Sequence, residues 1–290
     1  LGDVYKRQVR DIGGHIVALK WTMKNIYNID EDDLQFVGYD SWNCYEVSFL
    51  LENGFPVSGV VKIVYPSDSE SIVESKSLKL YMNSYNMHKI GNNITTGINE
   101  VTRQIEADLS DALGCVVDVT FHYDDDIDLP DKAVKGHFVR LENLIDLETI
   151  EFTHYEEDPN ILEHAPMLGF MPFQVTSSAL RSNCRITNQP DWGDVFIHIQ
   201  GEDCVTPESL MRYIISMRKE NHFHEEICEC IYTRLRDLLA DDTEILVACL
   251  YTRRGGIDIN PVRASSPKLL NEVVPGLIDS DVPHRKTPRQ

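Results

Sequence analysis

Two residues in the stretch SNCRITNQPDWG, at positions 182–193, can act as a nucleophile and an acid. Cys184 and Asp191 are seven residues apart, and the Pro-Asp-x-Gly turn can fold them toward each other. Cysteine attacks electrophilic carbon as a thiolate, and a protonated carboxyl group can donate the proton that such an addition needs. The same spacing also fits a buried cysteine that packs as a small hydrophobic residue and an aspartate that caps its own turn. Spacing alone favours this second interpretation.

The stretch NHFHEEIC, residues 221–228, contains a pattern similar to a zinc motif. In H-E-x-x-H both histidines lie on one face of a helix, whereas here Cys228 replaces the second histidine. A solvated helix start explains the stretch better, because Glu225 and Glu226 then lie near the positive end of the helix dipole. Cys228 and Cys230 would point about 160° apart on a helix of ~3.6 residues per turn, so we expect both to pack in the core.

Two further stretches can bind an anion. ESKSLKLY, residues 74–81, places two lysines beside small hydroxyl groups, although a strand edge that uses lysine against aggregation fits equally well. YTRRGGIDINP, residues 251–261, lets the backbone approach a ligand at its glycines while a guanidinium binds a phosphate. An exposed Gly-Gly turn is the alternative there. Neither G-x-x-x-x-G-K-[ST] nor G-x-G-x-x-G occurs, so no P-loop or Rossmann site is indicated.

The charge of the chain limits its partners. Its 290 residues contain 27 Lys and Arg against 47 Asp and Glu, a formal net charge of −20. Phosphate backbones and anionic membranes repel such a chain, so we expect a small-molecule or protein partner and no direct nucleic-acid or membrane partner. The longest apolar run, residues 245–251, is far shorter than the ~20 residues that cross a bilayer. With no export signal and seven scattered cysteines, we expect a cytoplasmic protein without a disulfide framework.

The N-terminal half predicts a hairpin, a helix and another strand. The expected elements are strands at 42–51, 57–65 and 116–123 and a helix at 97–113. Asn53-Gly54 can supply the positive φ angles of the hairpin turn, and Gly114 stands where the helix would end. The acidic, proline-bearing run 124–132 then predicts a surface loop or linker.

The C-terminal half repeats this order of strand, helices and strand. The expected elements are strands at 149–153, 194–200 and 244–251, a helix that begins at Pro207 and a second helix at about 224–239. Thr206 before Pro207 is a helix-start signal. From about residue 265 the chain carries four prolines and little periodicity, so we expect a surface arm.

Each half thus predicts the same kind of unit, which indicates an α+β fold of two related modules. The chain has no initiator Met, and DVYKRQ at positions 3–8 looks like the translated end of a sequencing-library transposon. The predicted organisation is a non-native leader at 1–8, an N-terminal module at 9–135, a C-terminal module at 136–264 and a tail at 265–290.

Taken together, ESKSLKLY, SNCRITNQPDWG, NHFHEE and YTRRGGIDINP, in this order and spacing, resemble the long, two-module form of NADPH-dependent 7-cyano-7-deazaguanine reductase. These are the QueF nitrile reductases of queuosine biosynthesis. The resemblance runs from about Trp42 to Arg263 and implies tandem tunnel-fold (T-fold) modules, antiparallel sheets with helices packed on one face. It also implies a homo-oligomer, expected to be a dimer, with sites between modules or subunits. The stretch 158–173 matches no motif of the family.

The resemblance implies a reaction in which a nitrile becomes a primary amine at the expense of two NADPH, with no metal. Cys184 would add to the nitrile carbon as a thiolate and form a covalent thioimide, which splits one difficult step into easier ones. Asp191 would deliver a proton to the nitrile nitrogen and should be kept protonated by burial beside Trp192. His224 would assist proton transfer, and the imine intermediate must be sequestered from water.

The resemblance also assigns binding residues. The substrate pocket would consist of Val73, Glu74, Ser75, His224 and Glu225, with Glu74 and Glu225 accepting hydrogen bonds from the guanine-like edge. Ser75, Lys76, Arg254 and Gly255 would contact NADPH, where positive charge suits the 2′-phosphate that distinguishes it from NADH.

Three alternatives remain at this stage. A T-fold relative that transfers an amine onto tRNA would use Cys184 and Asp191 but lack the ESKSLKLY motif, and a charge of −20 fits tRNA poorly. A zinc cyclohydrolase of the same fold would need His222, His224 and Cys228 as metal ligands. A base-binding module would leave Cys184 inert.

Overall fold

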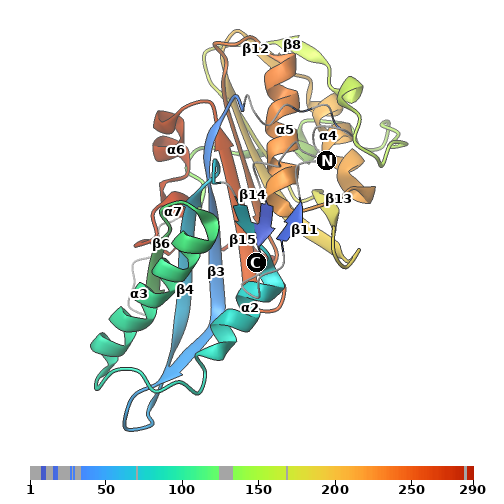
Figure 1. Ribbon diagram of the computed structural model, residues 1–290. Helices are drawn as coiled ribbons and strands as arrows, with labels where there is room; N and C mark the ends of the chain where they lie inside the picture. Colours follow the sequence, from blue (N-terminus) through green and yellow to red (C-terminus); the bar gives the residue numbers. More distant parts are fainter. Residues whose placement is uncertain are drawn as a thin grey trace, which may run out of the picture.

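The computed structural model describes residues 8–10, 16–18, 27, 29, 34–69, 71–123, 133–167, 169–283 and 286–290. One mainly antiparallel, ten-stranded sheet extends through both halves, and helices cover it (Figure 1). Its strands are β3 (Val37–Leu50), β4 (Pro56–Pro66), β6 (Asp118–His122), β7 (Val139–Arg140), β9 (Phe173–Ser177), β10 (Arg181–Cys184), β11 (Pro190–Gln200), β13 (Asn221–His222), β14 (Glu244–Tyr251) and β15 (Ile257–Ala264). The strand order is β13-β10-β11-β14-β15-β3-β4-β6, and β9 joins β11 to β7. The coarse expectation of an α+β fold is confirmed.

The remaining elements lie around this sheet. The helices are α2 (Ser75–Ser84), α3 (Ile94–Leu113), α4 (Pro207–Ser216), α5 (His224–Leu238), α6 (Pro267–Val273) and α7 (Pro275–Ile278), with short 3₁₀ turns η1 (Leu141–Asn143), η2 (Pro159–Ile161) and η3 (Met217–Lys219). Two small sheets consist of β1 (Gln8–Arg10), β2 (Ile16–Ala18) and β5 (Ser71–Val73), and of β8 (His164–Pro166) and β12 (Asp203–Val205). No helix in the described ranges is long and apolar enough to cross a membrane.

The predicted N-terminal hairpin is confirmed as β3 and β4, although only one turn residue has the expected backbone angle. Gly54 has φ of 87°, whereas among non-glycine residues of the described chain only Asn188 has a positive φ. The predicted helix is α3, which Asn93 caps and Gly114 ends at φ of 69°. The predicted strand at 116–123 is β6.

The N-terminal core forms because α2 and α3 place their apolar faces against β3, β4 and β6. Val101, Ile105 and Leu109 lie one helical turn apart on α3, and all three are fully buried. They pack with Phe49 and Val61 of the hairpin. The apolar face of α3, with its helical spacing, therefore packs on the apolar face of the strands, where every second residue points inward.

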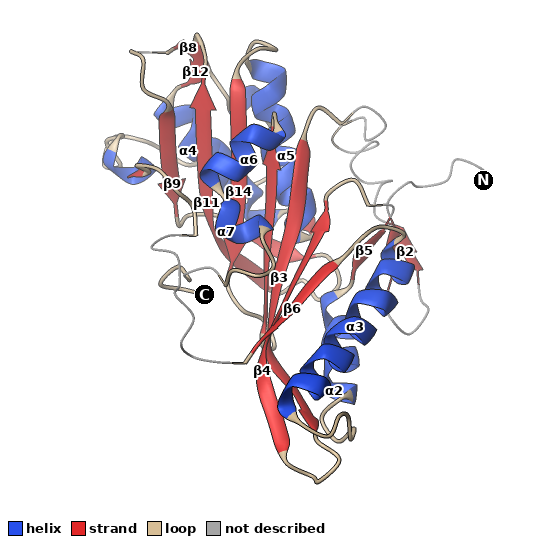
Figure 2. Ribbon diagram, turned by 90° about the vertical axis from the view of Figure 1, so that its left-hand side faces the viewer, coloured by secondary structure: helices blue, strands red, loops and turns tan. Residues whose placement is uncertain are grey.

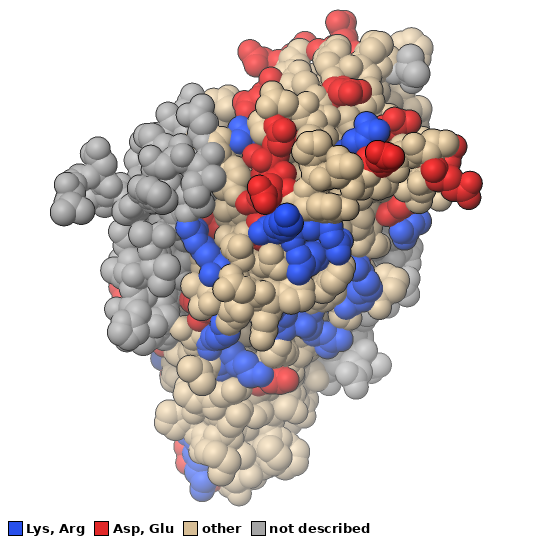
Figure 3. All heavy atoms as spheres, turned by 90° about the vertical axis from the view of Figure 1, so that its right-hand side faces the viewer, with Lys and Arg blue, Asp and Glu red and all other residues tan. Residues whose placement is uncertain are grey.

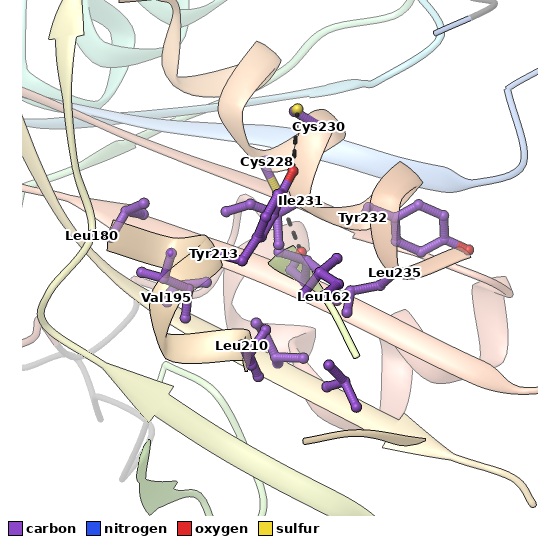
Figure 4. Close-up of a cluster of buried hydrophobic side chains, with 14 of the residues drawn as sticks. Leu162, Leu180, Val195, Leu210, Tyr213, Cys228, Cys230, Ile231, Tyr232 and Leu235 are labelled. Atoms are coloured by element: carbon purple, nitrogen blue, oxygen red, sulfur yellow. Dashed lines mark hydrogen bonds between the residues drawn. The ribbon is translucent and has the colours of Figure 1, made fainter. Parts of the chain in front are cut away.

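The C-terminal core repeats this arrangement with α4 and α5 over β11 and β14. Val195, Ile197 and Ile199 alternate along β11 and point into it, as predicted. Figure 4 shows the tightly packed side chains, with Tyr213 of α4 facing Cys230 of α5. The Tyr213 hydroxyl lies 3.6 Å from the Cys230 sulfur, so this cysteine packs in the core as expected.

The two halves share one sheet because β15 pairs with β3 along eight residues of each strand, from Ile257↔Cys44 to Ala264↔Val37. On one face of the sheet lie α2 to α5, and on the other lie α6 and α7 (Figures 1 and 2). The prediction of helices on one face is therefore incomplete.

The predicted surface arm after residue 265 is also wrong. Leu269, Leu270 and Val273 of α6 are buried against the sheet face that α5 does not cover. The buried Lys62 of β4 donates to three backbone carbonyls of this segment, those of Gly276, Asp279 and Val282, each at 2.6 Å. The tail is thus fixed to the sheet by both apolar packing and hydrogen bonds.

Three other sequence predictions have different outcomes. Residues 149–153 form no strand and lie in turns and extended coil. The predicted linker 124–132 and leader residues 1–7 lie outside the described residues, while Gln8, assigned to the leader, pairs with Ser71 in β5. The unassigned stretch 158–173 contains η2 and β8, and β8 pairs with β12.

Candidate active site

Cys184 and Asp191 lie on one hairpin and on the same side of it. The hairpin is formed by β10 and β11, with Ser182 opposite Asp191. The backbone N–H of Cys184 donates to the carbonyl of Gln189 at 2.7 Å, and that of Asn188 donates to the carbonyl of Cys184 at 2.8 Å. Asn188, at φ of 53°, provides the left-handed position that this tight turn requires. The predicted Pro-Asp-x-Gly turn is wrong, because residues 190–193 begin β11 and the chain reverses at 185–189 instead, yet this hairpin still brings Cys184 and Asp191 to one side.

Arg254 contacts both the turn of this hairpin and the start of β11. Its Nη1 donates to Oδ1 of Asp191 at 2.6 Å, and its Nη2 contacts Thr187 at 3.2 Å and Gln189 at 3.3 Å. The Arg254 guanidinium also forms a hydrogen bond with the Cys184 thiol. One side chain from the β14–β15 turn thus contacts both predicted reacting groups.

The environment of Cys184 favours the thiolate. Partial burial raises the pKa of the Cys184 thiol, but hydrogen bonds from the Thr187 hydroxyl, Arg254 and the backbone N–H groups of Thr187 and Ile186 outweigh burial and lower it. The other cysteines with a perturbed thiol pKa, which include Cys44, Cys204 and Cys228, are shifted upward by burial. Among the thiols with a shifted pKa in the described chain, Cys184 alone is activated.

His224 approaches Asp191 from the start of α5. Its Nε2 lies 3.4 Å from Oδ2 of Asp191, and its ring stacks on that of Tyr251 with 3.9 Å between centroids. Its Nδ1 is buried and has no hydrogen-bond partner among the described residues. A buried polar atom without a partner is uncommon in native proteins and fits a position that a substrate contacts.

The environment of Asp191 differs from the sequence-based expectation. The carboxyl is 2% exposed, so the expected burial is present. However, Trp192 points away on the other side of β11, is 38% exposed, and lies against Arg181 and Arg218. The immediate neighbours of Asp191 are Arg254 and His224, because alternate residues of a strand face opposite sides.

The ESKSLKLY stretch forms helix α2 and not a strand edge. Glu74 is the N-cap, and its Oε2 accepts from the Ser77 backbone N–H at 2.9 Å and from the Ser77 hydroxyl at 3.2 Å. Ser75 is half-buried in the first turn and Lys76 is exposed. The anion-binding hypothesis for Lys76 is therefore sterically open.

Helix α2 lies against the turn that carries Arg254. Lys79 forms an ion pair of 3.0 Å with Glu46, and a side-chain carbon built on Gly255 would lie 3.2 Å from Nζ of Lys79. The same atom built on Gly256 would lie 2.5 Å from the Glu46 carboxyl carbon. Both glycines have positive φ, so this close approach depends on them.

The rest of the predicted substrate pocket lies between β5 and the start of α5. Val73 ends β5 and is buried, and Ile72 beside it packs against Phe223, the residue before His224. Glu225 is 2% exposed in the first turn of α5. The N-terminal and C-terminal motifs therefore approach each other at this point, although the structure gives no direct contact of Val73, Ser75 or Lys76 with Cys184 among the described residues.

The zinc interpretation fails on geometry. The Cys228 thiol donates to the carbonyls of Val247 and Pro261, each at 3.5 Å, inside the core. His222 contacts Glu226 and not His224 or Cys228. Within the described ranges, no group of three or more His, Cys, Asp or Glu is arranged to hold a metal.

Sequence reasoning missed two contributors to the site. Thr187 lies inside SNCRITNQPDWG but was not selected. Glu226 was interpreted only through the helix dipole, although it contacts His222, Phe223 and Arg185. The arginine directly after Cys184 was the available signal for the contact between Arg185 and Glu226.

The two halves match the sequence patterns of two families. Residues 17–121 match the family described as nitrile reductase, 7-cyano-7-deazaguanine-reductase N-term, and residues 190–268 match the QueF-like protein family. The chain is also 38% identical over 240 residues to the NADPH-dependent 7-cyano-7-deazaguanine reductase of Colwellia psychrerythraea strain 34H. That match covers 82% of this chain and 80% of the relative. This chain belongs to the 7-cyano-7-deazaguanine reductase family.

Membership of the reductase family agrees with the geometry described above. The C-terminal match includes Asp191, His224 and Arg254, and the N-terminal match includes β5 and α2. Cys184 precedes the C-terminal match by six residues, and the structure places it beside Arg254. Three of the four motifs of the reductase resemblance thus surround Asp191, and the fourth, ESKSLKLY, lies beside them on α2.

Proposed function

We propose that this chain catalyses the NADPH-dependent reduction of the nitrile of 7-cyano-7-deazaguanine to 7-aminomethyl-7-deazaguanine in queuosine biosynthesis. The observation that carries this proposal is the arrangement of one activated thiol, Cys184, with Arg254, Asp191 and His224. A nitrile carbon is a poor hydride acceptor, so a nucleophile that first converts it into a thioimide lowers the difficulty of the reduction.

The nucleophile is Cys184. Its thiolate adds to the nitrile carbon, a C–S bond forms, and the electrons of one π bond move to nitrogen, which takes up a proton. Arg254 and Thr187 stabilise the thiolate before attack because both donate hydrogen bonds to sulfur. Arg254 comes from the turn after β14, so formation of the site depends on the pairing of β11 with β14.

The proton comes from the Asp191–His224 pair. Arg254 donates to Oδ1 of Asp191 at 2.6 Å, and Nε2 of His224 lies 3.4 Å from Oδ2, so His224 is placed to carry a proton to or from Asp191. The family resemblance implies that Asp191 delivers this proton to nitrogen. The two groups share one proton-transfer role, and removing either should slow the steps that protonate nitrogen.

The remaining steps regenerate Cys184. Each of two NADPH molecules supplies one hydride. The first hydride reduces the thioimide carbon, the C–S bond then breaks, and the thiolate leaves an imine; the second hydride and a proton give the amine. The overall balance is one nitrile, two NADPH and two protons to one primary amine and two NADP⁺. Burial of Asp191 and His224 limits water at the imine, which would otherwise hydrolyse.

The base of the substrate binds between Glu74 and Glu225. The N-cap contacts of Glu74 use Oε2, which leaves Oε1 for the N–H groups of a guanine-like edge. Glu225, in the first turn of α5, provides the second acceptor next to His224. Val73 and Ser75 line the pocket, because β5 packs on Phe223 through Ile72.

NADPH binds on the face that carries α2 and the Arg254 turn. Figure 3 shows that Lys and Arg gather in a band across the middle of one face of a chain whose net charge is −20. Lys76 is exposed and Arg254 is 28% exposed, so both can meet phosphate groups from solvent, with Ser75 and Gly255 beside them. Such a local excess of positive charge attracts an anionic cofactor.

The two halves are two T-fold modules, residues 9–135 and 136–264, in a homodimer. The presence of two helices over each half of one sheet, with separate cores, supports this assignment. A dimer would bring further residues toward the surface between α2 and the β10–β11 hairpin.

The test is stoichiometry. With 7-cyano-7-deazaguanine as the limiting substrate, the absorbance of NADPH should fall by two equivalents per nitrile, and NADH should be used poorly. Consumption of no NADPH, together with no covalent adduct by intact mass, would contradict the proposal. An adduct without oxidation would instead favour the amine-transferring relative.

Cys184→Ala should abolish both the adduct and turnover, because no other described thiol is activated and placed beside Asp191. Cys115→Ala is the matched control, since Cys115 lies after α3 in the N-terminal half. Asp191→Asn should keep the fold and mainly slow proton-dependent steps. Full activity of the Cys184→Ala protein would exclude the thioimide route.

A further inference from the structure

Glu226 of α5 contacts three donors with one buried carboxylate. Its Oε1 accepts from Nη1 of Arg185 at 2.9 Å, and its Oε2 accepts from the Phe223 backbone N–H at 2.9 Å and lies 3.2 Å from Nδ1 of His222. The residue is 5% exposed. None of these contacts is with the reacting groups described above.

These contacts connect the two elements that carry the chemistry. Arg185 directly follows Cys184 and begins the turn of the β10–β11 hairpin. Phe223 directly precedes His224, so the Glu226 carboxylate holds the backbone from which His224 projects. Glu226 is therefore bonded, on one side, to the neighbour of the nucleophile and, on the other, to the neighbour of the proton carrier.

A short parallel strand pair gives the same connection at the backbone. Asn183 pairs with Asn221 and Cys184 with His222, which are the last residues of β10 and β13. Two residues on each strand give little rigidity by themselves. The charge-assisted contacts of Glu226 add rigidity to this connection, because hydrogen bonds between ionised groups are stronger than neutral ones and restrict geometry.

We propose that Glu226 is a positioning residue that sets the distance between the Cys184 thiol and the Asp191–His224 pair. This inference rests on the proposed function, because it assigns Glu226 a role in the proton-coupled addition of Cys184 to the nitrile. Glu226 acts through Arg185 on one side and through the start of α5 on the other, and contacts no substrate.

Loss of the Arg185 contact should slow the addition step without changing substrate affinity. A misplacement of about 1 Å can cost about 100-fold in rate when two groups must act together. We therefore expect Glu226→Gln to lower kcat about 10- to 100-fold, with KM for the nitrile changed by less than about 3-fold. The rate of adduct formation, followed by acid quench and intact mass, should fall by the same factor as kcat.

Alkylation of Cys184 by a haloacetamide separates this role from a general disturbance. That reaction needs the thiolate but no proton from His224, and Glu226 does not contact the thiol. The alkylation rate and its pH profile should therefore be unchanged in Glu226→Gln while nitrile addition slows. A parallel fall in both rates would overturn the proposal.

Glu220→Gln is the matched control. Glu220 also lies beside His222, at 3.5 Å, and is partly buried, but it bonds to Tyr27 and to the Glu157 backbone N–H and does not contact Arg185. Both substitutions remove one negative charge next to His222 and should lower the thermal midpoint. Only Glu226→Gln should lower kcat more than about 3-fold; equal losses in the two variants would indicate a structural role alone.

Arg185→Gln tests the same contact from its other end, and this protects the test if Glu226→Gln folds poorly. The Arg185 side chain is 21% exposed, so its replacement disturbs the core less. If the pair acts as one tether, the double variant should lose no more activity than Arg185→Gln alone. Independent, multiplicative losses would contradict the proposal. Wild-type protein that forms no adduct with the nitrile would instead contradict the proposed function.

Discussion

Two arginine–carboxylate clusters lie on the β14–β15 hairpin, and they differ in their access to solvent. Arg263 binds Asp40 at 2.7 Å and Glu229 at 2.7 Å, and the Arg263 and Asp40 side chains are fully buried. Arg254 binds Asp191 at 2.6 Å, but its side chain is 28% exposed. The same kind of ion pair is thus closed to solvent within the sheet, in what we call the closed cluster, and accessible to solvent at the turn, in the open cluster.

The closed cluster serves the fold, and the open one can exchange partners. The guanidinium of Arg263 bonds to two carboxylates and to the backbone carbonyls of Tyr39 and Val262, which leaves no route for a ligand. Arg254 divides its donors among Asp191, Thr187, Gln189 and Cys184, and each of these contacts can be replaced by a phosphate or a substrate atom. Burial, more than the type of residue, separates the arginine that is closed to ligands from the one that a ligand can reach.

The largest effect is expected from opening the closed cluster. Arg263→Ala leaves Asp40 and Glu229 with buried, uncompensated charge, and breaking a buried pair costs about 3–5 kcal/mol. The free energy of unfolding in urea should fall by that amount, or the protein should be recovered unfolded. Lys268→Ala is the control, because its ion pair with Glu272 is exposed on α6. A variant as stable as wild type would show that the closed cluster does not hold the two halves together.

A smaller and different effect is expected at the open cluster. Arg254→Lys keeps the charge but loses the planar group that contacts Asp191 and Thr187 together. We expect kcat/KM for NADPH to fall about 10- to 100-fold while the urea midpoint stays close to that of wild type. Steady-state kinetics and unfolding curves on the same preparation check this. A loss of stability comparable to that of Arg263→Ala would remove the distinction between the two clusters.

The smallest effect concerns the buried His222, whose side chain, unlike that of arginine, can lose its charge. Burial lowers the pKa of His222, but hydrogen bonds to Glu220 and Glu226 outweigh burial and raise it to about 9. Because this folded value lies above the unfolded value of about 6.5, the stabilisation is complete below pH 6.5 and is lost as the pH rises to 9.

The difference in unfolding free energy between wild type and His222→Asn should therefore shrink by no more than about 3 kcal/mol between pH 6 and pH 9. Urea unfolding of both proteins at several pH values measures this difference, and most other ionisations cancel in it. A difference that stays constant with pH would mean that His222 is neutral in the folded protein.

The sequence predicted elements whose pattern is local. The β3–β4 hairpin and α3 follow from alternation or helical period over ten residues or more, together with a capping residue at each end of α3. The strand expected at 149–153 does not form, because β-branched residues form a strand only where a neighbouring strand provides backbone hydrogen-bond partners. The tail was misjudged because α6 and α7 are short, and their burial depends on the sheet face that only the folded chain presents.

The sequence predicted which residues belong to the candidate site better than it predicted the contacts between them. Spacing alone left Cys184 and Asp191 undecided, and the family resemblance supplied their roles. The contact of Arg254 with Asp191 joins residues 63 positions apart, and no local pattern reports such a distance. Glu226 was visible only as one of two glutamates at a helix start, because its partner Arg185 reaches it from the turn after β10, 41 residues earlier in the chain.

The pairing of β15 with β3 also determines when the molecule can be completed during synthesis. One edge of β3 pairs with the neighbouring β4, whereas its other edge, along residues 37–44, pairs with residues 257–264, which are synthesised more than 200 residues later. Until then, the emerging N-terminal half carries a long strand with an unpaired edge, the kind of edge that joins other chains. Arrival of the last strand of the sheet covers this edge and also delivers the turn that contains Arg254. Completion of the sheet and assembly of the candidate site therefore occur in the same late event.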